Sequence, residues 1–148
     1  MNFQNFYKAG KIKFSFEIFP PKTEQGIQNV LESLAELKQF DPAYVSVTYG
    51  AMGSTRNLTS DLALQINHHL GMTTAFHFTC VGSSRAEITK YVGRLKNEGI
   101  KLIVALRGDP PQGQTNFTPP QDGFRYANEL VTYLRKIDGF SIAVAGYP

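Results

Sequence analysis

The feature that most constrains the fold is an alternation of strand-like and helix-like segments at nearly constant spacing. Corresponding points on successive strand-like segments, such as Glu17, Thr48, His77 and Arg107, are about 30 residues apart, which is the length of one βαβ unit. Five segments are rich in β-branched or aromatic residues and bounded by Gly, Pro or Asp, as strands are: 13–19, 43–49, 74–81, 101–107 and 140–147. Four segments between them carry apolar residues at helical spacing: 24–39, 57–70, 84–98 and 122–137. This order predicts an α/β fold with a parallel sheet and helices packed outside it.

The predicted strands have two unlike faces. Bulky apolar residues alternate with residues that are small in mid-strand and polar at the C-terminal end. In the fourth strand this pattern assigns Leu102, Val104 and Leu106 to the helix side and Ala105 and Arg107 to the other side. A flat sheet covered on both faces would need bulky residues on both, so the asymmetry favours the wall of a barrel with a ligand space at its C-terminal mouth.

The length of the chain limits how much of a barrel it can form. A complete (β/α)₈ TIM-type barrel needs about 250 residues, whereas this chain has 148. We therefore interpret residues 1–148 as the N-terminal part of a single barrel domain, an incomplete one of about five strands and four helices, with the C-terminal units absent from this chain.

Composition excludes several classes of function. The net charge is only +3 and the basic residues are scattered, so no nucleic-acid partner is expected. Cys80 is the single cysteine, which suits a reducing compartment, and no apolar run has the length of a membrane span. The sequence predicts a cytoplasmic protein with no membrane partner.

Glu17 is an acid within an aromatic strand, F-S-F-E-I-F. Two interpretations are open: a solvent-facing residue or partner of a nearby arginine, and a carboxyl held in an apolar cavity. In the second, desolvation would raise the pKa of the carboxyl and make it a proton donor near neutral pH.

The stretch A-L-R-G-D-P-P ends the fourth strand. A turn explains Gly108, Asp109 and the prolines, but not Arg107, which we expect to point into the mouth and to suit a phosphate or another anion. Gly108 would let a ligand approach the backbone closely.

The other candidates carry weaker signals. His77 lies between two phenylalanines, where a lone histidine is more often a core residue than a ligand. Thr48 and Tyr49 end a predicted strand just before a glycine, and an ordinary strand followed by a turn explains them without a ligand. No second His, Cys or acid completes a metal site at a convincing spacing, so no metal is expected.

Together these motifs resemble the methylenetetrahydrofolate reductase family. The matching stretches come in the family's order: F-S-F-E-I-F-P-P-K-T (14–23), V-S-V-T-Y-G-A (45–51), H-F-T-C (77–80), A-L-R-G-D-P-P (105–111) and S-I-A-V-A-G-Y-P (141–148). The resemblance implies an FAD-containing barrel that passes a hydride from NADH or NADPH to the flavin. The flavin then reduces 5,10-methylenetetrahydrofolate to 5-methyltetrahydrofolate, in the one-carbon metabolism that leads to methionine.

The resemblance also implies roles for individual residues. Glu17 matches the general acid that protonates the folate and opens its five-membered ring, and Asp109 matches an acid beside the flavin that tunes it. The remaining matches are flavin-site positions: Thr48, Tyr49, Ala51, His77, Arg107, Gly108, Tyr126, Ala127 and Tyr147. The full-length protein is expected to be a homo-oligomer.

Two alternatives stay open beside this oxidoreductase. One is a non-catalytic barrel fragment that assembles with a partner. The other is an unrelated barrel enzyme that binds a phosphorylated substrate through Arg107.

Overall fold

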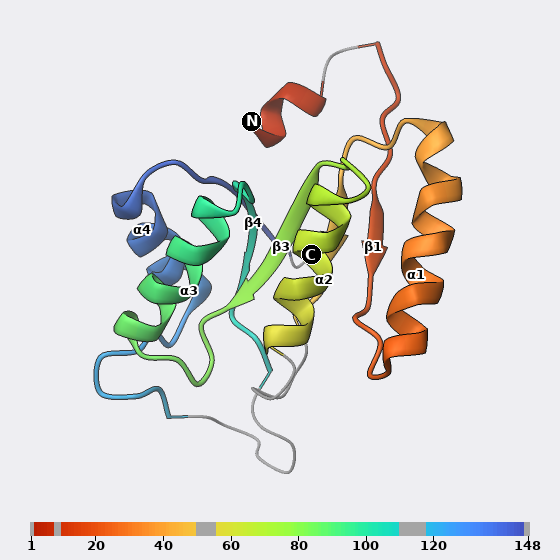
Figure 1. Ribbon diagram of the computed structural model, residues 1–148. Helices are drawn as coiled ribbons and strands as arrows, with labels where there is room; N and C mark the ends of the chain where they lie inside the picture. Colours follow the sequence, from red (N-terminus) through yellow and green to blue (C-terminus); the bar gives the residue numbers. More distant parts are fainter. Residues whose placement is uncertain (1, 8–9, 50–55, 110–117, 147–148) are drawn as a thin grey trace.

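The computed structural model describes residues 2–7, 10–49, 56–109 and 118–146. In these residues one parallel sheet has the strand order β1-β2-β3-β4-β5, so every strand neighbours the next one in the chain (Figure 1). The strands are β1 (Phe16–Ile18), β2 (Val45–Val47), β3 (Thr74–Thr79), β4 (Leu102–Leu106) and β5 (Ser141–Val144).

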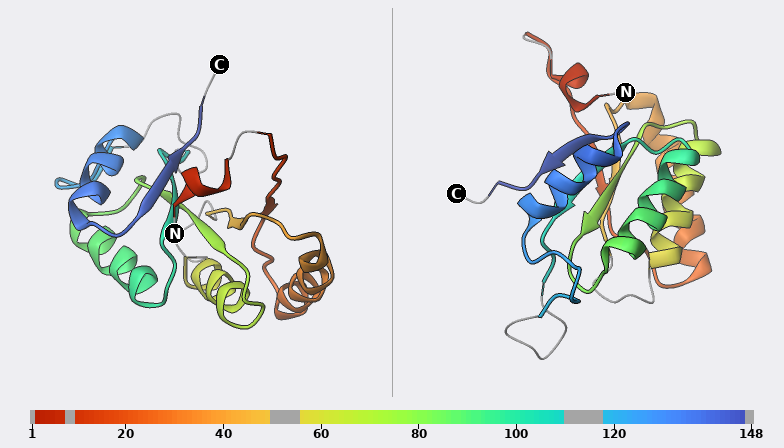
Figure 2. Two further views of the ribbon diagram at one scale, coloured as in Figure 1. Left: turned by 90° about the horizontal axis from the view of Figure 1, so that it is seen from above. Right: turned by 90° about the vertical axis from the view of Figure 1, so that its left-hand side faces the viewer.

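Four α-helices cover one face of this sheet. They are α1 (Glu24–Leu37), α2 (Arg56–His68), α3 (Arg85–Asn97) and α4 (Ala127–Ile137), and two short 3₁₀-helices accompany them, η1 (Phe3–Phe6) and η2 (Lys38–Phe40). Seen from above, the α-helices follow an arc outside the curved sheet, and η1 lies on the opposite, concave side (Figure 2, left). The predicted α/β alternation is confirmed, and the arrangement is that of part of a (β/α)₈ barrel, with β1 and β5 at the edges of the described sheet. In the described part of the chain, no helix has the length and apolar character needed to cross a membrane.

Local signals set most of the helix ends. The Thr23 hydroxyl accepts a hydrogen bond from the Gly26 amide at 3.1 Å and caps α1. Ser84 and Glu87 form a reciprocal capping box at the start of α3. Gly99, with φ +90°, turns the chain after that helix, as glycine commonly does at a helix C-terminus.

Helix α4 starts five residues later than the pattern 122–137 predicted. The Gly123 amide donates to the Pro120 carbonyl at 2.8 Å and closes a turn there. The Glu129 carboxylate then accepts hydrogen bonds from the amides of Arg125 and Tyr126, which fixes the first helical residue at Ala127.

The main core lies between the sheet and the helices. Phe76 is fully buried there, and its ring lies about 6 Å from the rings of Tyr49, Phe78 and Tyr91. The helices contribute the buried side chains Leu34, Ile66, Ile88, Val92, Leu95, Leu130 and Leu134.

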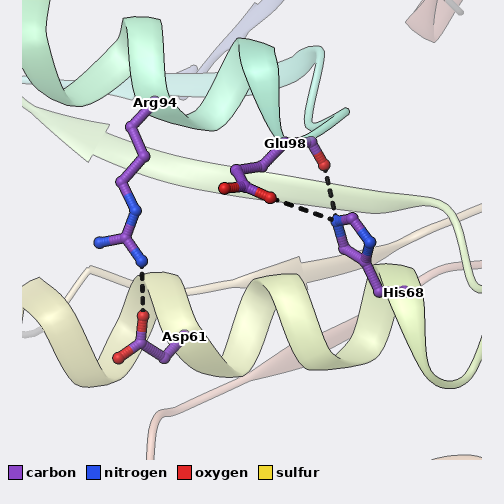
Figure 3. A network of polar contacts seen from close by, with 4 residues as sticks. All are labelled: Asp61, His68, Arg94 and Glu98. Atoms are coloured by element: carbon purple, nitrogen blue, oxygen red, sulfur yellow. Dashed lines mark hydrogen bonds and ion pairs between the residues drawn. The ribbon is translucent and has the colours of Figure 1, made fainter.

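Polar contacts also join neighbouring helices at the surface. Arg94 of α3 donates to the Asp61 carboxylate of α2 at 2.9 Å (Figure 3). His68, at the end of α2, donates through Nε2 to the backbone carbonyl of Glu98 at 2.8 Å, and its ring lies 3.9 Å from the Glu98 carboxylate. The His68 side chain is exposed at the surface.

The face assignment predicted for β4 is wrong. Ile103 pairs in register with Phe76 and Ile142, and both Ile103 and Ala105 are buried in the core beneath the helices. Leu102 and Val104 lie instead on the concave side. The error arose because both faces of K-L-I-V-A-L are apolar, so alternation alone does not tell them apart.

What covers Leu102 is the N-terminus of the chain. Residues 2–7, here called the N-terminal plug, place Phe3 against Ala75 and Leu102 on the concave face, where Phe3 is only 7 % exposed. The Ser141 hydroxyl of β5 donates to the Asn2 side chain at 2.9 Å and accepts from the Phe3 amide at 3.0 Å. The helix η1 in this plug is not among the predicted elements, although an N-cap asparagine followed by F-Q-N-F-Y is a recognisable signal for a short apolar helix.

Cys80 provides a test of this core. It is fully buried, its Sγ donates to the Arg107 carbonyl at 3.3 Å, and burial raises the pKa of the thiol to about 11. Because the thiolate is the reactive form, we expect almost no reaction of native protein with Ellman's reagent at pH 8, and release of one equivalent per chain in denaturant. Rapid stoichiometric reaction with unchanged far-UV circular dichroism would contradict this placement.

Candidate functional site at the C-terminal ends of the strands

The open concave face brings together side chains from neighbouring strands. Glu17 of β1, Ser46 of β2 and Ala75 of β3 are at one level by register, and His77 projects from the same face two residues further along β3. Small side chains at Ser46 and Ala75 leave space above the sheet, so Glu17 and His77 reach toward each other over them.

Glu17 and His77 form the central contact of this site. Their Oε2 and Nε2 atoms are 3.4 Å apart, and their side chains are 52 % and 12 % exposed, respectively. The described residues therefore do not enclose Glu17 in an apolar cavity, and its partner is a histidine, where the sequence suggested an arginine.

The environment of His77 determines its charge. Desolvation lowers the pKa of the imidazole below its usual value, and the Glu17 carboxylate opposes this effect only in part. The ring is consequently neutral near pH 7, with one nitrogen able to donate and the other able to accept a hydrogen bond.

Thr48 and Tyr49 follow β2 but lie in different surroundings. The Thr48 amide donates to the Ile18 carbonyl at 2.8 Å and continues the ladder with β1. The Tyr49 ring packs against Phe76 and Phe78 in the core beneath the helices. Its aromatic face is thus used by the core, and a ligand on the concave side would meet the Tyr49 backbone.

Arg107 directly follows the last residue of β4, and its side chain is exposed. The pleat of β4, continued by one residue, places it on the side of Ile103 and Ala105, toward the helices. Its charge also acts on the buried Cys80, whose pKa it lowers slightly against the effect of burial. The role of Arg107 as an anion-binding residue at the mouth stays a prediction.

The backbone conformation at position 108 requires glycine. Its φ is +86°, and a Cβ atom there would lie 3.0 Å from Thr79 Cβ and 3.1 Å from Val81 Cγ2. The turn therefore needs glycine whether or not a ligand approaches, and Asp109, which follows, is exposed at the mouth.

The other predicted positions are not brought to the Glu17–His77 contact. Tyr126, whose side chain is exposed, precedes α4, and Ala127 is its first residue. Ala51 and Tyr147 lie outside the described residues. Over the part of the chain that the structure describes, no group of three or more His, Cys, Asp or Glu is placed to hold a metal ion.

The chemistry of the donor set fits a flavin. An isoalloxazine presents carbonyl oxygens and ring nitrogens that need both donors and acceptors, and the concave face offers the His77 ring, the Thr48 hydroxyl and the Glu17 carboxylate above a small-residue floor. A parallel barrel wall with polar side chains at the C-terminal strand ends defines the class of barrel enzymes.

Comparison with known proteins identifies the family within that class. Residues 2–148 match the family model described as methylenetetrahydrofolate reductase, and the chain belongs to this family. It is 40 % identical over 143 residues to methylenetetrahydrofolate reductase (NADH) 1 of Arabidopsis thaliana, covering 95 % of this chain and 24 % of that protein. It is 39 % identical over 139 residues to 5,10-methylenetetrahydrofolate reductase of Escherichia coli K12, a match that covers 94 % of this chain and 45 % of that protein. It is also 36 % identical over 149 residues to methylenetetrahydrofolate reductase 2 of Saccharomyces cerevisiae. That match covers 98 % of this chain and 25 % of the yeast protein. The chain thus spans between about a quarter and less than half of the length of these relatives.

Proposed function

We propose that this chain forms the N-terminal part of an oxidoreductase that converts 5,10-methylenetetrahydrofolate to 5-methyltetrahydrofolate with NADH or NADPH as electron donor, in the one-carbon metabolism that leads to methionine. The observation that carries the proposal is the Glu17–His77 contact on the open face of a barrel wall, in a chain of this family. The Arabidopsis relative is named as an NADH enzyme, which favours NADH as the donor.

The cofactor in this proposal is FAD, which supplies two-electron chemistry by taking a hydride from the nicotinamide and delivering it to the folate. Thr48 and His77 are the described polar side chains on the concave face that would hold it there. Arg107, Gly108, Tyr126 and Ala127 remain predicted contacts, as do Tyr49 through its backbone and Ala51 and Tyr147 outside the described residues.

Glu17 is the proposed general acid. Its carboxyl is half exposed to the open face and half in contact with His77, so one oxygen can face a substrate while the other stays oriented. A protonated carboxyl placed beside the folate ring nitrogen would donate the proton that ring opening needs.

Purification of the intact protein separates the hypotheses. We expect a yellow protein whose released flavin is FAD by mass spectrometry, and NADH oxidation that depends on 5,10-methylenetetrahydrofolate. A colourless folded protein would favour the non-catalytic fragment, and binding of phosphate esters without flavin would favour the unrelated barrel enzyme.

A cytoplasmic location and a homo-oligomeric state stay predictions, to be checked by fractionation and light scattering.

Asp109→Asn is expected to raise the reduction potential of the bound flavin. A carboxylate at the mouth disfavours the anionic reduced flavin, and loss of one charge at effective dielectric constants near 20 is worth on the order of tens of millivolts for a two-electron couple. Potentiometric titration of wild type and variant measures the shift. An unchanged potential would leave Asp109 as a turn residue only.

A further inference from the structure

We infer that His77 is a positioning residue for Glu17: its ring orients the carboxyl and shares a single proton with it. This inference rests on the proposed function, in which Glu17 donates a proton to the folate.

The geometry of the sheet brings the two side chains together. Glu17 and His77 come from β1 and β3, which are separated by β2, so only long side chains can meet across the gap of about 10 Å. The residue between them is Ser46, whose hydroxyl donates to the Phe16 carbonyl at 3.4 Å. Ser46 is therefore small and turned toward the backbone, and it leaves the Nε2 and Oε2 atoms free to approach each other to 3.4 Å. A further approach of a few tenths of an ångström makes this contact a hydrogen bond.

The charges around the ring leave Glu17 as its electrostatic partner. Within the described ranges, Glu17 is the charged group that shifts the pKa of His77, and desolvation is the larger, opposing effect. The neighbour on β4 in register with His77 is Val104, and the continuation of the register on β2 is Thr48; both are uncharged. Arg107 and Asp109 follow the end of β4, beyond this level of the sheet. A neutral imidazole beside a carboxyl can accept its proton and return it.

The proton balance of the step is simple. The pair holds one proton between Glu17 Oε2 and His77 Nε2. When the folate nitrogen takes a proton, an O–H bond of Glu17 breaks, an N–H bond forms on the folate, and a carboxylate and a neutral imidazole remain. The pair regains a proton from water at the exposed side of Glu17. No electrons move in this step.

A second His–Glu pair in the chain provides a matched control. His68 and Glu98 lie at the surface between α2 and α3, with Nε2 and Oε2 3.9 Å apart and both side chains about half exposed (Figure 3). His68 is anchored to a backbone carbonyl, so its contact with the Glu98 carboxylate shares no catalytic proton.

The test uses the intact protein carrying His77→Gln, with FAD in excess. Anaerobic stopped flow measures the pH dependence of two half-reactions: flavin reduction by NADH and reduction of the folate by the reduced flavin. Glutamine keeps a hydrogen-bonding side chain at position 77, but it cannot take up a proton from the carboxyl and return it. We expect the folate half-reaction to slow at least about 10-fold at pH 7 and to recover as the pH falls, because general acid catalysis requires the protonated carboxyl. In His77→Gln, flavin reduction by NADH should slow less than the folate half-reaction and should not recover as the pH falls. Both half-reactions of the control His68→Gln should stay within about 2-fold of wild type. Equal slowing of both half-reactions at every pH would overturn the inference.

A measurement without substrate keeps the two proposals distinguishable. The His77 ring is titrated by NMR in wild type and in Glu17→Gln. Loss of the carboxylate, which raises the pKa of His77, should lower that pKa further. An unchanged His77 titration would refute the pair even if folate reduction is confirmed. A shifted titration in a protein that does not reduce the folate would support the pair and refute the function.

Discussion

Replacing Glu17 with glutamine is expected to slow reduction of 5,10-methylenetetrahydrofolate by about 100-fold or more and to leave flavin reduction by NADH within a few-fold of wild type. The amide keeps the shape of the side chain and its place beside His77, but it cannot act as the proton donor, and a general acid contributes typically 10²–10⁴-fold. Stopped-flow absorbance of the flavin measures the two half-reactions separately.

The matched control for this variant is Glu98→Gln. Glu98 is the acid of the surface His–Glu pair, and its loss should change neither half-reaction. Glu17→Asp adds a second comparison, because it keeps the carboxyl but withdraws it from His77 by one methylene; an intermediate folate rate is expected. Equal slowing of both half-reactions in Glu17→Gln would mean that Glu17 serves the fold and not the chemistry.

The second large effect concerns the faces of β4. Ile103 is fully buried beneath the helices, so Ile103→Ala should lower the free energy of unfolding of this domain by about 2–5 kcal/mol. Leu106, at the end of the strand on the other face, is only partly buried, and Leu106→Ala should cost clearly less. Urea unfolding of the intact protein, followed by circular dichroism, measures both.

This pair of variants separates two arrangements of the strand. If the strand had the orientation that alternation predicted, Leu106→Ala would be the more damaging substitution. A larger loss for Leu106→Ala than for Ile103→Ala, with unchanged dependence on urea, would therefore contradict the register between β3 and β4.

Much of the fold follows from local patterns. The repeat of about 30 residues predicts the parallel order, and Thr23 and Gly99 mark helix ends where the structure has them. The orientation of β4 does not follow, because Leu102 is covered by Phe3, which lies about 100 residues away in the chain. A contact of that range leaves no trace in the periodicity of either segment.

The candidate site shows the same division. Glu17 and His77 each stand out as polar residues in aromatic strands, yet their contact depends on the register of β1, β2 and β3 and on the small size of Ser46. The sequence leaves both a turn and a close approach by a ligand open for Gly108, and its positive φ and the nearness of Thr79 account for it from within the chain. Sequence patterns identify polar strand ends, whereas pairing partners and available space require the register.

The most direct test of the proposed function is anaerobic reoxidation of the reduced protein by its folate. The intact protein is reduced with one equivalent of NADH and mixed with 5,10-methylenetetrahydrofolate while the flavin absorbance is recorded. We predict full return of the oxidised flavin spectrum and formation of one equivalent of 5-methyltetrahydrofolate per flavin, with a return about 100-fold slower or more in Glu17→Gln. A wild-type flavin that stays reduced in the presence of saturating folate would contradict the account.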